Sequence, residues 1–156
     1  MKKVARVLVL LLSVIFLYNC GGTGEQKQSG GTEKPAQAAQ TNPGDPMNNK
    51  GIGPVRKILL EEINPTMAAE GEQIYKEKCL ACHKPQDKFV GPAPKGILDR
   101  RSPEWIMNMI LNPEEMVKSD PIAKKLLVEY NLAPMANQHL TAEQARKVLE
   151  YFRTLK

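Results

Sequence analysis

Cys79-Leu80-Ala81-Cys82-His83 is the stretch of this sequence that decides how the rest of it is interpreted. It holds two thiols separated by two residues, with an imidazole directly after the second thiol. In a helical turn this spacing places both sulfur atoms on the same side. We consider three kinds of site for the motif: a covalent c-type haem, a structural zinc ion and a thiol–disulfide redox pair.

The pattern Cys-x-x-Cys-His is typical of c-type haem attachment, because two thioether bonds must reach two vinyl groups on one edge of the porphyrin. Zinc would need two further ligands, and the remaining candidates are His139 and the distant Cys20. A thioredoxin-like dithiol normally belongs to a βαβ unit, which the sequence does not indicate. We therefore predict one covalent haem c, bound through Cys79 and Cys82, with His83 as an axial ligand of the iron.

The N-terminus has the pattern of an export signal. Three basic residues open it, and the apolar run from Val7 to Leu17 is shorter than the roughly 20 residues that span a bilayer. The run leads into Leu17-Tyr18-Asn19-Cys20-Gly21, which resembles a bacterial lipoprotein signal, although its residues before the cysteine are larger than usual. We expect residues 1–19 to be removed and Cys20 to be acylated; the alternative is an ordinary cleaved signal. Either outcome implies export, and we expect a lipid-anchored protein on the periplasmic side of a bacterial membrane.

A polar segment separates this signal from the rest of the chain. Residues 20–50 are rich in Gly, Ser, Thr, Gln, Asn and Pro and carry few apolar side chains, so we predict a flexible tether. Residues 21–50, thirty residues of flexible coil, reach roughly 30 Å. We assign residues 51–156 to the folded domain. The formal net charge of +5 includes Lys2, Lys3 and Arg6 of the signal, and without them the balance is too small to indicate nucleic-acid binding.

The domain itself is predicted to be all-α, since no stretch shows sustained alternation of apolar and polar residues. Capping residues followed by apolar residues at helical spacing mark the helix starts, at Thr66, Ser102, Asn112, Asp120 and Thr141. The first helix is expected to run to about Leu80. The last one opens with a capping box formed by Thr141 and Gln144 and is expected to run to about Leu155. The apolar stretch Ile58-Leu59-Leu60 with Ile63 is interpreted as a strap packed on the domain.

In this setting the chain resembles class I cytochrome c over roughly residues 66–156. Gly71 and Tyr75 stand eight and four residues before Cys79, in the register that the family uses where its first and last helices cross. The resemblance implies that Gly71 allows a close approach of these helices. The aromatic residues expected across the contact are Tyr151 and Phe152. It also implies the class I cytochrome c fold, with helices packed around one covalently bound haem.

The resemblance further implies how the iron is held. Gly91-Pro92 follows the haem motif at the family's distance, so the carbonyl of Pro92 is expected to accept a hydrogen bond from His83, with Pro94 as the near alternative. Such a bond fixes the orientation and tautomer of the imidazole. The family places its distal methionine just before the last helix, which implies that Met135 is the second axial ligand. The other candidates for that position are Met107, Met109, Met116 and His139.

Several side chains near the motif have two interpretations. Trp105 could donate its indole N–H to a haem propionate or simply fill the core. Arg100 and Arg101 could pair with propionates, although a solvated loop is the preferred interpretation. Lysines surround the motif in sequence and could form a docking rim, but acidic residues are interleaved with them; these lysines are Lys76, Lys78, Lys84, Lys88 and Lys95.

Thioether attachment together with histidine and methionine ligands gives a closed iron, so we expect an electron carrier and not an enzyme. Methionine ligation favours the ferrous state. A haem-based redox or gas sensor is the alternative function, and a peroxidase-type enzyme is a further one. The expected partners are a quinol-oxidising complex as donor and a terminal reductase or oxidase as acceptor. The run containing Gly91-Pro92, Arg101-Ser102-Pro103-Glu104-Trp105 and Asn112-Pro113 is similar to cytochromes found with nitrous oxide reductases.

Overall fold

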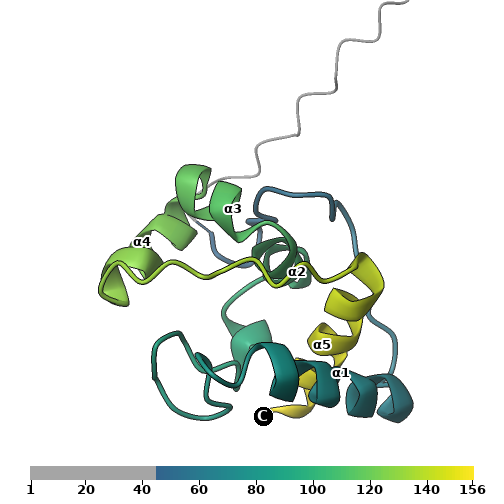
Figure 1. The fold of residues 1–156 in the computed structure, drawn as a ribbon. Coiled ribbons are helices and arrows are strands. Elements are labelled where there is room, and N and C mark those ends of the chain that lie inside the picture. The colour runs from purple at the N-terminus through teal and green to yellow at the C-terminus, as the bar shows by residue number, and fades with distance from the viewer. Residues whose placement is uncertain (1–44) are drawn as a thin grey trace, which may run out of the picture. The chain divides into compact units, whose positions relative to one another are not determined.

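Helices account for all the regular secondary structure of residues 45–156, the part of the chain that this computed structural model describes (Figure 1). The elements are α1 Pro65–Lys78, the short 3-10 helix η1 Ile97–Asp99, α2 Pro103–Leu111, α3 Pro113–Ser119, α4 Pro121–Glu129 and α5 Ala142–Thr154. The predicted all-α class is confirmed. The export signal, Cys20 and most of the tether lie outside the described residues. No helix within residues 45–156 is long and apolar enough to cross a bilayer.

Proline at the first helical position starts four of these helices, where its missing N–H has no partner to lose. The caps at Ser102 and Asp120 and the capping box at Thr141 are confirmed. The predicted cap at Thr66 is wrong, because the side chain of Asn64 accepts the N–H of Met67 at 3.0 Å and the helix starts at once with proline. Asn64-Pro65 is itself a cap followed by the first helical residue.

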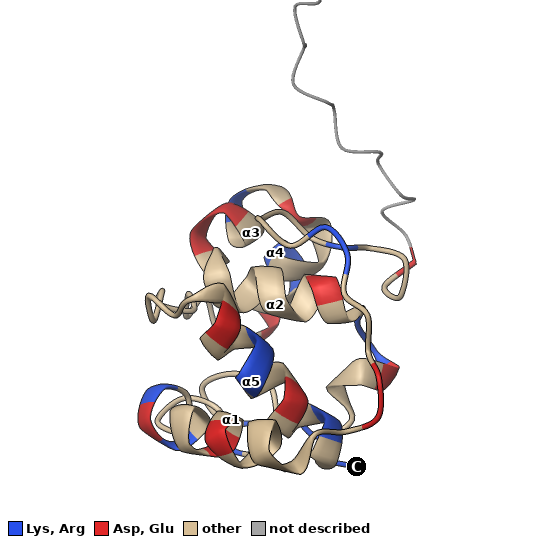
Figure 2. Ribbon diagram, turned by 90° about the vertical axis from the view of Figure 1, so that its right-hand side faces the viewer, with Lys and Arg blue, Asp and Glu red and all other residues tan. Residues whose placement is uncertain are grey.

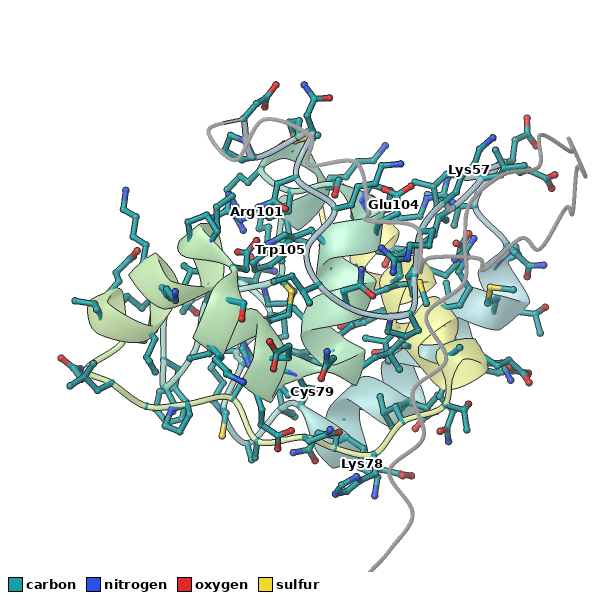
Figure 3. All side chains as sticks on the ribbon, turned by 90° about the horizontal axis from the view of Figure 1, so that it is seen from above. Lys57, Lys78, Cys79, Arg101, Glu104 and Trp105 are labelled. Carbon is teal, nitrogen blue, oxygen red and sulfur yellow. The ribbon has the colours of Figure 1, made fainter. Side chains whose placement is uncertain are left out.

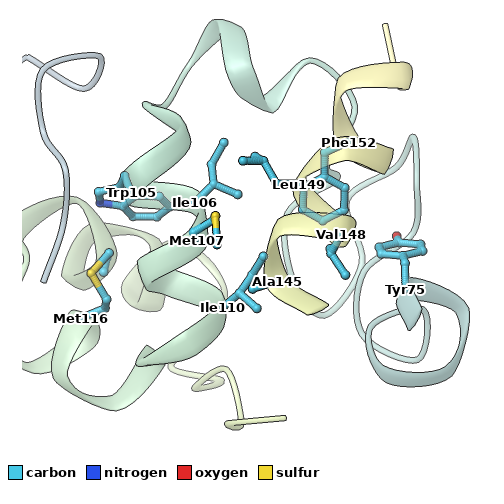
Figure 4. Packing of buried hydrophobic residues seen from close by; sticks show 11 residues of the cluster. Tyr75, Trp105, Ile106, Met107, Ile110, Met116, Ala145, Val148, Leu149 and Phe152 are labelled. Atoms are coloured by element: carbon cyan, nitrogen blue, oxygen red, sulfur yellow. The ribbon is translucent and has the colours of Figure 1, made fainter. Parts of the chain in front are cut away.

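The seam between α1 and α5 is the central contact of the domain (Figures 1 and 4). A side chain at Gly71 would overlap the backbone carbonyl of Lys147, so only glycine permits this approach. One turn further along α1, the ring of Tyr75 packs at 5.2 Å from Tyr151 and at 5.7 Å from Phe152, measured between ring centroids. The contact that the family resemblance implied is therefore present.

A strap of non-helical chain before α1 is held mainly through its backbone. The fully buried side chain of Asn108 on α2 donates to the carbonyls of Lys50 and Val55 and accepts the N–H of Val55, each at 2.9 Å. Glu104, one turn earlier on α2, accepts the N–H of Ile58 at 3.0 Å. These bonds compensate the backbone groups that the strap buries against the helix.

The strap differs from the expected one in its extent. Of the predicted apolar stretch, Ile58 packs against the core, whereas Leu59 is 74% exposed. At the other end, Asn49 is buried and donates to Asp120 at 2.7 Å, although residue 49 was assigned to the flexible tether. The folded domain therefore begins before residue 51. The polar composition around Asn49 did not indicate folded structure, because this stretch is held by backbone and amide hydrogen bonds instead of apolar packing.

Candidate haem site

The motif Cys79–His83 forms an additional turn directly after α1. The N–H of Cys79 still bonds to the carbonyl of Tyr75 at 2.9 Å, and the N–H groups of Cys82 and His83 return to the carbonyl of Cys79 at 3.0 and 2.9 Å. This turn brings two thiols and one imidazole together at the end of a helix that α5 holds in place. Both cysteines are free thiols, and Figure 3 shows Cys79 next to Lys78, the last residue of α1.

The two thiols have different surroundings. Cys79 is half-buried and packs against the core, whereas Cys82 is exposed. Burial, followed by the nearby Cys82, raises the pKa of the Cys79 thiol to about 11. Redox-active dithiols depend on a lowered thiol pKa, because the thiolate is the attacking species. The surroundings of Cys79 therefore disfavour the thiol–disulfide interpretation of the motif.

One ring nitrogen of His83 is engaged by a backbone carbonyl. Nδ1 lies 2.8 Å from the carbonyl oxygen of Pro92, and a carbonyl can only accept, so Nδ1 must carry the proton. In the neutral ring the other nitrogen, Nε2, then carries no proton and is available to a metal. Pro92 therefore occupies the place that the family resemblance implies for it, whereas Pro94 is buried and its carbonyl accepts the N–H of Ile97 at 3.0 Å.

Gly91 supports the face of the same imidazole. A side-chain carbon at this position would lie 2.7 Å from Nδ1 and 2.9 Å from Nε2 of His83, closer than real contacts allow. The N–H of Gly91 also bonds to the carbonyl of Cys82 at 2.9 Å, which returns the loop to the motif. Sequence reasoning named the Gly91-Pro92 pair but missed the role of the glycine, because only the fold shows what would overlap with its side chain.

The candidate distal ligands have different environments in the structure. Met116 is fully buried and its sulfur accepts the N–H of Ile52 at 3.0 Å, and Met107 is a core residue beside Ile106 (Figure 4). Met109 packs on the core from its edge. His139 is exposed and adopts a left-handed backbone with φ of 53°.

Met135 differs from all of these. It is half-buried on the non-helical segment between α4 and α5, and it neither belongs to the core nor packs against it. Among the candidates, it is therefore the methionine whose sulfur the protein core does not use.

The structure decides between the two interpretations of Trp105 and modifies that of Arg101. The indole N–H of Trp105 donates to buried Asp120 at 3.1 Å, so the tryptophan is a core residue and its N–H is already engaged. Arg101 is half-buried and not fully solvated, and its guanidinium lies 5.4 Å from the centre of the Trp105 ring (Figure 3). Burial and the neighbouring Arg100 lower the pKa of Arg101. Its buried Nε has no hydrogen-bond partner within residues 45–156.

The lysines around the motif are partly neutralised. Lys76 pairs with Glu72 at 2.9 Å, and Lys88 lies 3.9 Å from Glu129 and 4.3 Å from the centre of the Tyr130 ring. Figure 2 shows basic and acidic residues interspersed along the ribbon. The charge pattern by itself therefore does not define a positive face.

Comparison with known proteins agrees with this geometry. Residues 68–156, more than half of the chain, match the cytochrome c family. This chain belongs to the cytochrome c family. It is accordingly a haem electron-transfer protein whose domain binds c-type haem covalently, and its fold is the class I cytochrome c fold predicted from the sequence. No curated protein matches the chain significantly.

Solved structures of cytochromes c share the fold. A cytochrome c from Rhodothermus marinus is 41% identical with a TM-score of 0.64, covering 66% of this chain and 89% of its own. An engineered cytochrome c from the same organism, bound to a carbene intermediate, is also 41% identical with a TM-score of 0.61 and the same coverage. The cytochrome c domain of a Pseudomonas putida protein is 27% identical with a TM-score of 0.50, covering 54% of this chain and 85% of its own.

Proposed function

We propose that this cytochrome c is a mono-haem electron carrier held at the periplasmic side of a bacterial membrane by acylated Cys20 and the polar tether that follows it, which ends before Asn49. The observation that carries the proposal is the state of His83. Its Nδ1 is committed to Pro92, its ring face is packed on Gly91, and its Nε2 is left for the iron.

The residues present fit a c-type haem. Cys79 and Cys82 are free thiols on one turn and would form the two thioethers, while His83 and Met135 would ligate the iron. The buried, unpartnered Nε–H of Arg101 is a suitable donor for a propionate carboxylate. When bound, the haem supplies the one-electron couple of its iron, and a methionine ligand favours the ferrous state.

The protein's own part is to hold these ligands still and to exclude other chemistry. A hydrogen bond and a glycine contact fix the imidazole of His83, so we expect it to keep one orientation in both oxidation states. A thioether ligand from Met135 would leave no open position on the iron for a substrate. The function left to such a protein would be exchange of electrons with another protein.

We propose that partners dock where the loop directly after the haem motif, which carries Lys88, meets α4. Lys88 joins the two segments through Glu129 and Tyr130, and large apolar side chains are exposed on both sides of it. These side chains are Phe89, Val90, Val128 and Leu132. Exposed apolar groups beside lysines suit a protein surface with an apolar centre and acidic rim. A quinol-oxidising complex as donor and a terminal reductase or oxidase as acceptor are the partners we propose, with nitrous oxide reductase among the acceptors.

Absorption spectra of the haem-loaded wild type and of Met135→Ala test the assignment of the carrier. We expect the wild type to show the sulfur-to-iron charge-transfer band and the variant to lack it, with a lower midpoint potential. Met109→Ala, which removes a half-buried methionine at the edge of the core, should keep the band. An unchanged spectrum in Met135→Ala would refute the assignment.

Carbon monoxide distinguishes the carrier from the haem-based redox or gas sensor. The ferrous wild type should refuse carbon monoxide because Met135 would already ligate the iron, whereas Met135→Ala should bind it. Fast binding by the wild type would instead favour the sensor.

A further inference from the structure

Tyr75 makes a hydrogen bond whose partner is the residue that we assign to the iron. Its side chain is 1% exposed on α1, and its hydroxyl donates to the backbone carbonyl of His83. The bond runs from the helix across the motif turn to the residue at its end. It is therefore a tertiary contact and is not one of the backbone hydrogen bonds of α1 or of the motif turn.

Packing alone does not require this hydroxyl. The ring of Tyr75 meets Phe152 edge-on and Tyr151 at a tilt, contacts that a phenylalanine would also make. A buried hydroxyl, however, destabilises the fold unless it is paired, so its presence calls for a partner. The partner in this structure is the carbonyl of His83.

We propose that Tyr75 is a positioning residue for the axial ligand, fixing the backbone of His83 while Pro92 fixes its ring. The proposal rests on the proposed role of His83 at the iron. The two hydrogen bonds act on opposite ends of the residue, and Gly91 supports the ring face between them. His83 is thus held at three points by three different residues.

The state of the phenol suits this role. Burial, followed by the neighbouring Tyr151 and Cys79, raises the pKa of Tyr75 well above its ordinary value. The hydroxyl is the donor in this bond, because the carbonyl of His83 can only accept. The positive end of the Tyr75 O–H dipole points toward the peptide group of His83. This dipole would add positive potential close to the iron and should favour the ferrous state.

The test compares Tyr75→Phe with Tyr151→Phe in the haem-loaded protein. Both variants remove one phenolic hydroxyl from the same aromatic cluster, but the hydroxyl of Tyr151 makes no hydrogen bond within residues 45–156. We expect Tyr75→Phe to lower the midpoint potential and to shift the paramagnetic resonances of the His83 ring in the ferric protein. Tyr151→Phe should leave both unchanged. Unchanged potential and resonances in Tyr75→Phe would overturn the proposal, whatever the loss of stability.

A measurement on the wild type covers the case in which Tyr75→Phe fails to acquire haem. In the isotope-labelled ferrous protein, the Tyr75 hydroxyl proton should exchange slowly and couple to the carbonyl carbon of His83. A rapidly exchanging proton without that coupling would also overturn the proposal. A wild type that carries no haem is a different outcome, since it refutes the proposed function and not the hydrogen bond.

Discussion

His83 has one ring nitrogen engaged by Pro92 and one ring face against Gly91, which leaves the imidazole little freedom. Cys79 is half-buried and has a raised pKa, so it is poorly suited to redox exchange. Met135 is the candidate methionine that the core does not use. At the scale of single residues, therefore, the surroundings of His83 and Met135 suit metal ligation, and those of Cys79 disfavour thiol–disulfide exchange.

Gly91→Ala should disturb the site through the ring of His83. The new methyl group would lie 2.7 Å from Nδ1, so the ring must turn or the loop must move away from Pro92. We expect a smaller fraction of haem-bearing protein and about 1–3 kcal/mol less stability, the usual cost of overpacking. The ratio of haem absorbance to polypeptide, together with denaturant unfolding, measures both effects.

Gly96→Ala is the matched control for this substitution. Gly96 lies in the same loop at a φ of 62°, and a side chain there would meet nothing closer than 3.5 Å. We expect it to destabilise the protein by about 1–2 kcal/mol through backbone strain, with haem content and spectra unchanged. Equal haem loss in the two variants would contradict the specific role of Gly91.

At the scale of elements, the seam between α1 and α5 sets the position of the motif, because Cys79 directly follows α1. Gly71→Ala should destabilise the protein by about 1–3 kcal/mol, since the methyl group would overlap the carbonyl of Lys147. Helix propensity alone predicts the opposite sign, a gain of about 1 kcal/mol. Denaturant unfolding of Gly71→Ala decides between these two predictions. Ala69→Gly, at an exposed position of α1, is the control for helix propensity and should lower the free energy of unfolding by about 1 kcal/mol.

Most of the helices and their starting points could be predicted from the sequence, because capping residues and proline act locally. Ser102, Asp120 and Thr141 cap the helices as predicted. The cap at Thr66 failed for a local reason, because Asn64 caps the helix two residues earlier. The other failure occurred where the deciding contact is non-local. The strap before residue 58 was missed because it binds through backbone groups to Asn108, on a helix far along the chain. The motif itself was predictable because its chemistry lies within five consecutive residues.

On the scale of the whole molecule, the chain before α1 and the last helix are joined through one buried carboxylate. Glu150 on α5 accepts the N–H of Asn64, the cap of α1, at 2.8 Å and pairs with Arg146 and Arg153. Burial by itself would raise the pKa of Glu150, but the hydrogen bonds from Arg146, Asn64 and Arg153 outweigh it and leave the pKa lowered. The two arginine pairs lie at local helical spacing, but no local pattern indicated the bond to Asn64, which comes from a distant part of the chain.

The lowered pKa makes acid stability depend on Glu150. A carboxyl whose pKa is lower in the folded state contributes stability above its ordinary pKa of about 4.3 and loses it as the pH falls through the folded value. Glu150→Gln should therefore be less stable at neutral pH and should lose less stability on acidification than the wild type. The unfolding temperature, measured from neutral pH down to a pH below the pKa of Glu150, shows this difference. Glu77→Gln changes an exposed carboxyl and should show the same dependence of unfolding temperature on pH as the wild type. Parallel wild-type and Glu150→Gln curves would contradict the assignment.

The central claim is that the polypeptide binds one haem covalently through Cys79 and Cys82. The most direct test is the intact mass of the domain, produced in a host competent for c-type haem maturation and treated with acidified organic solvent to extract loose haem. We predict the mass of the polypeptide plus one haem, with the red colour retained by the protein. A colourless product with the mass of the bare polypeptide would contradict the account.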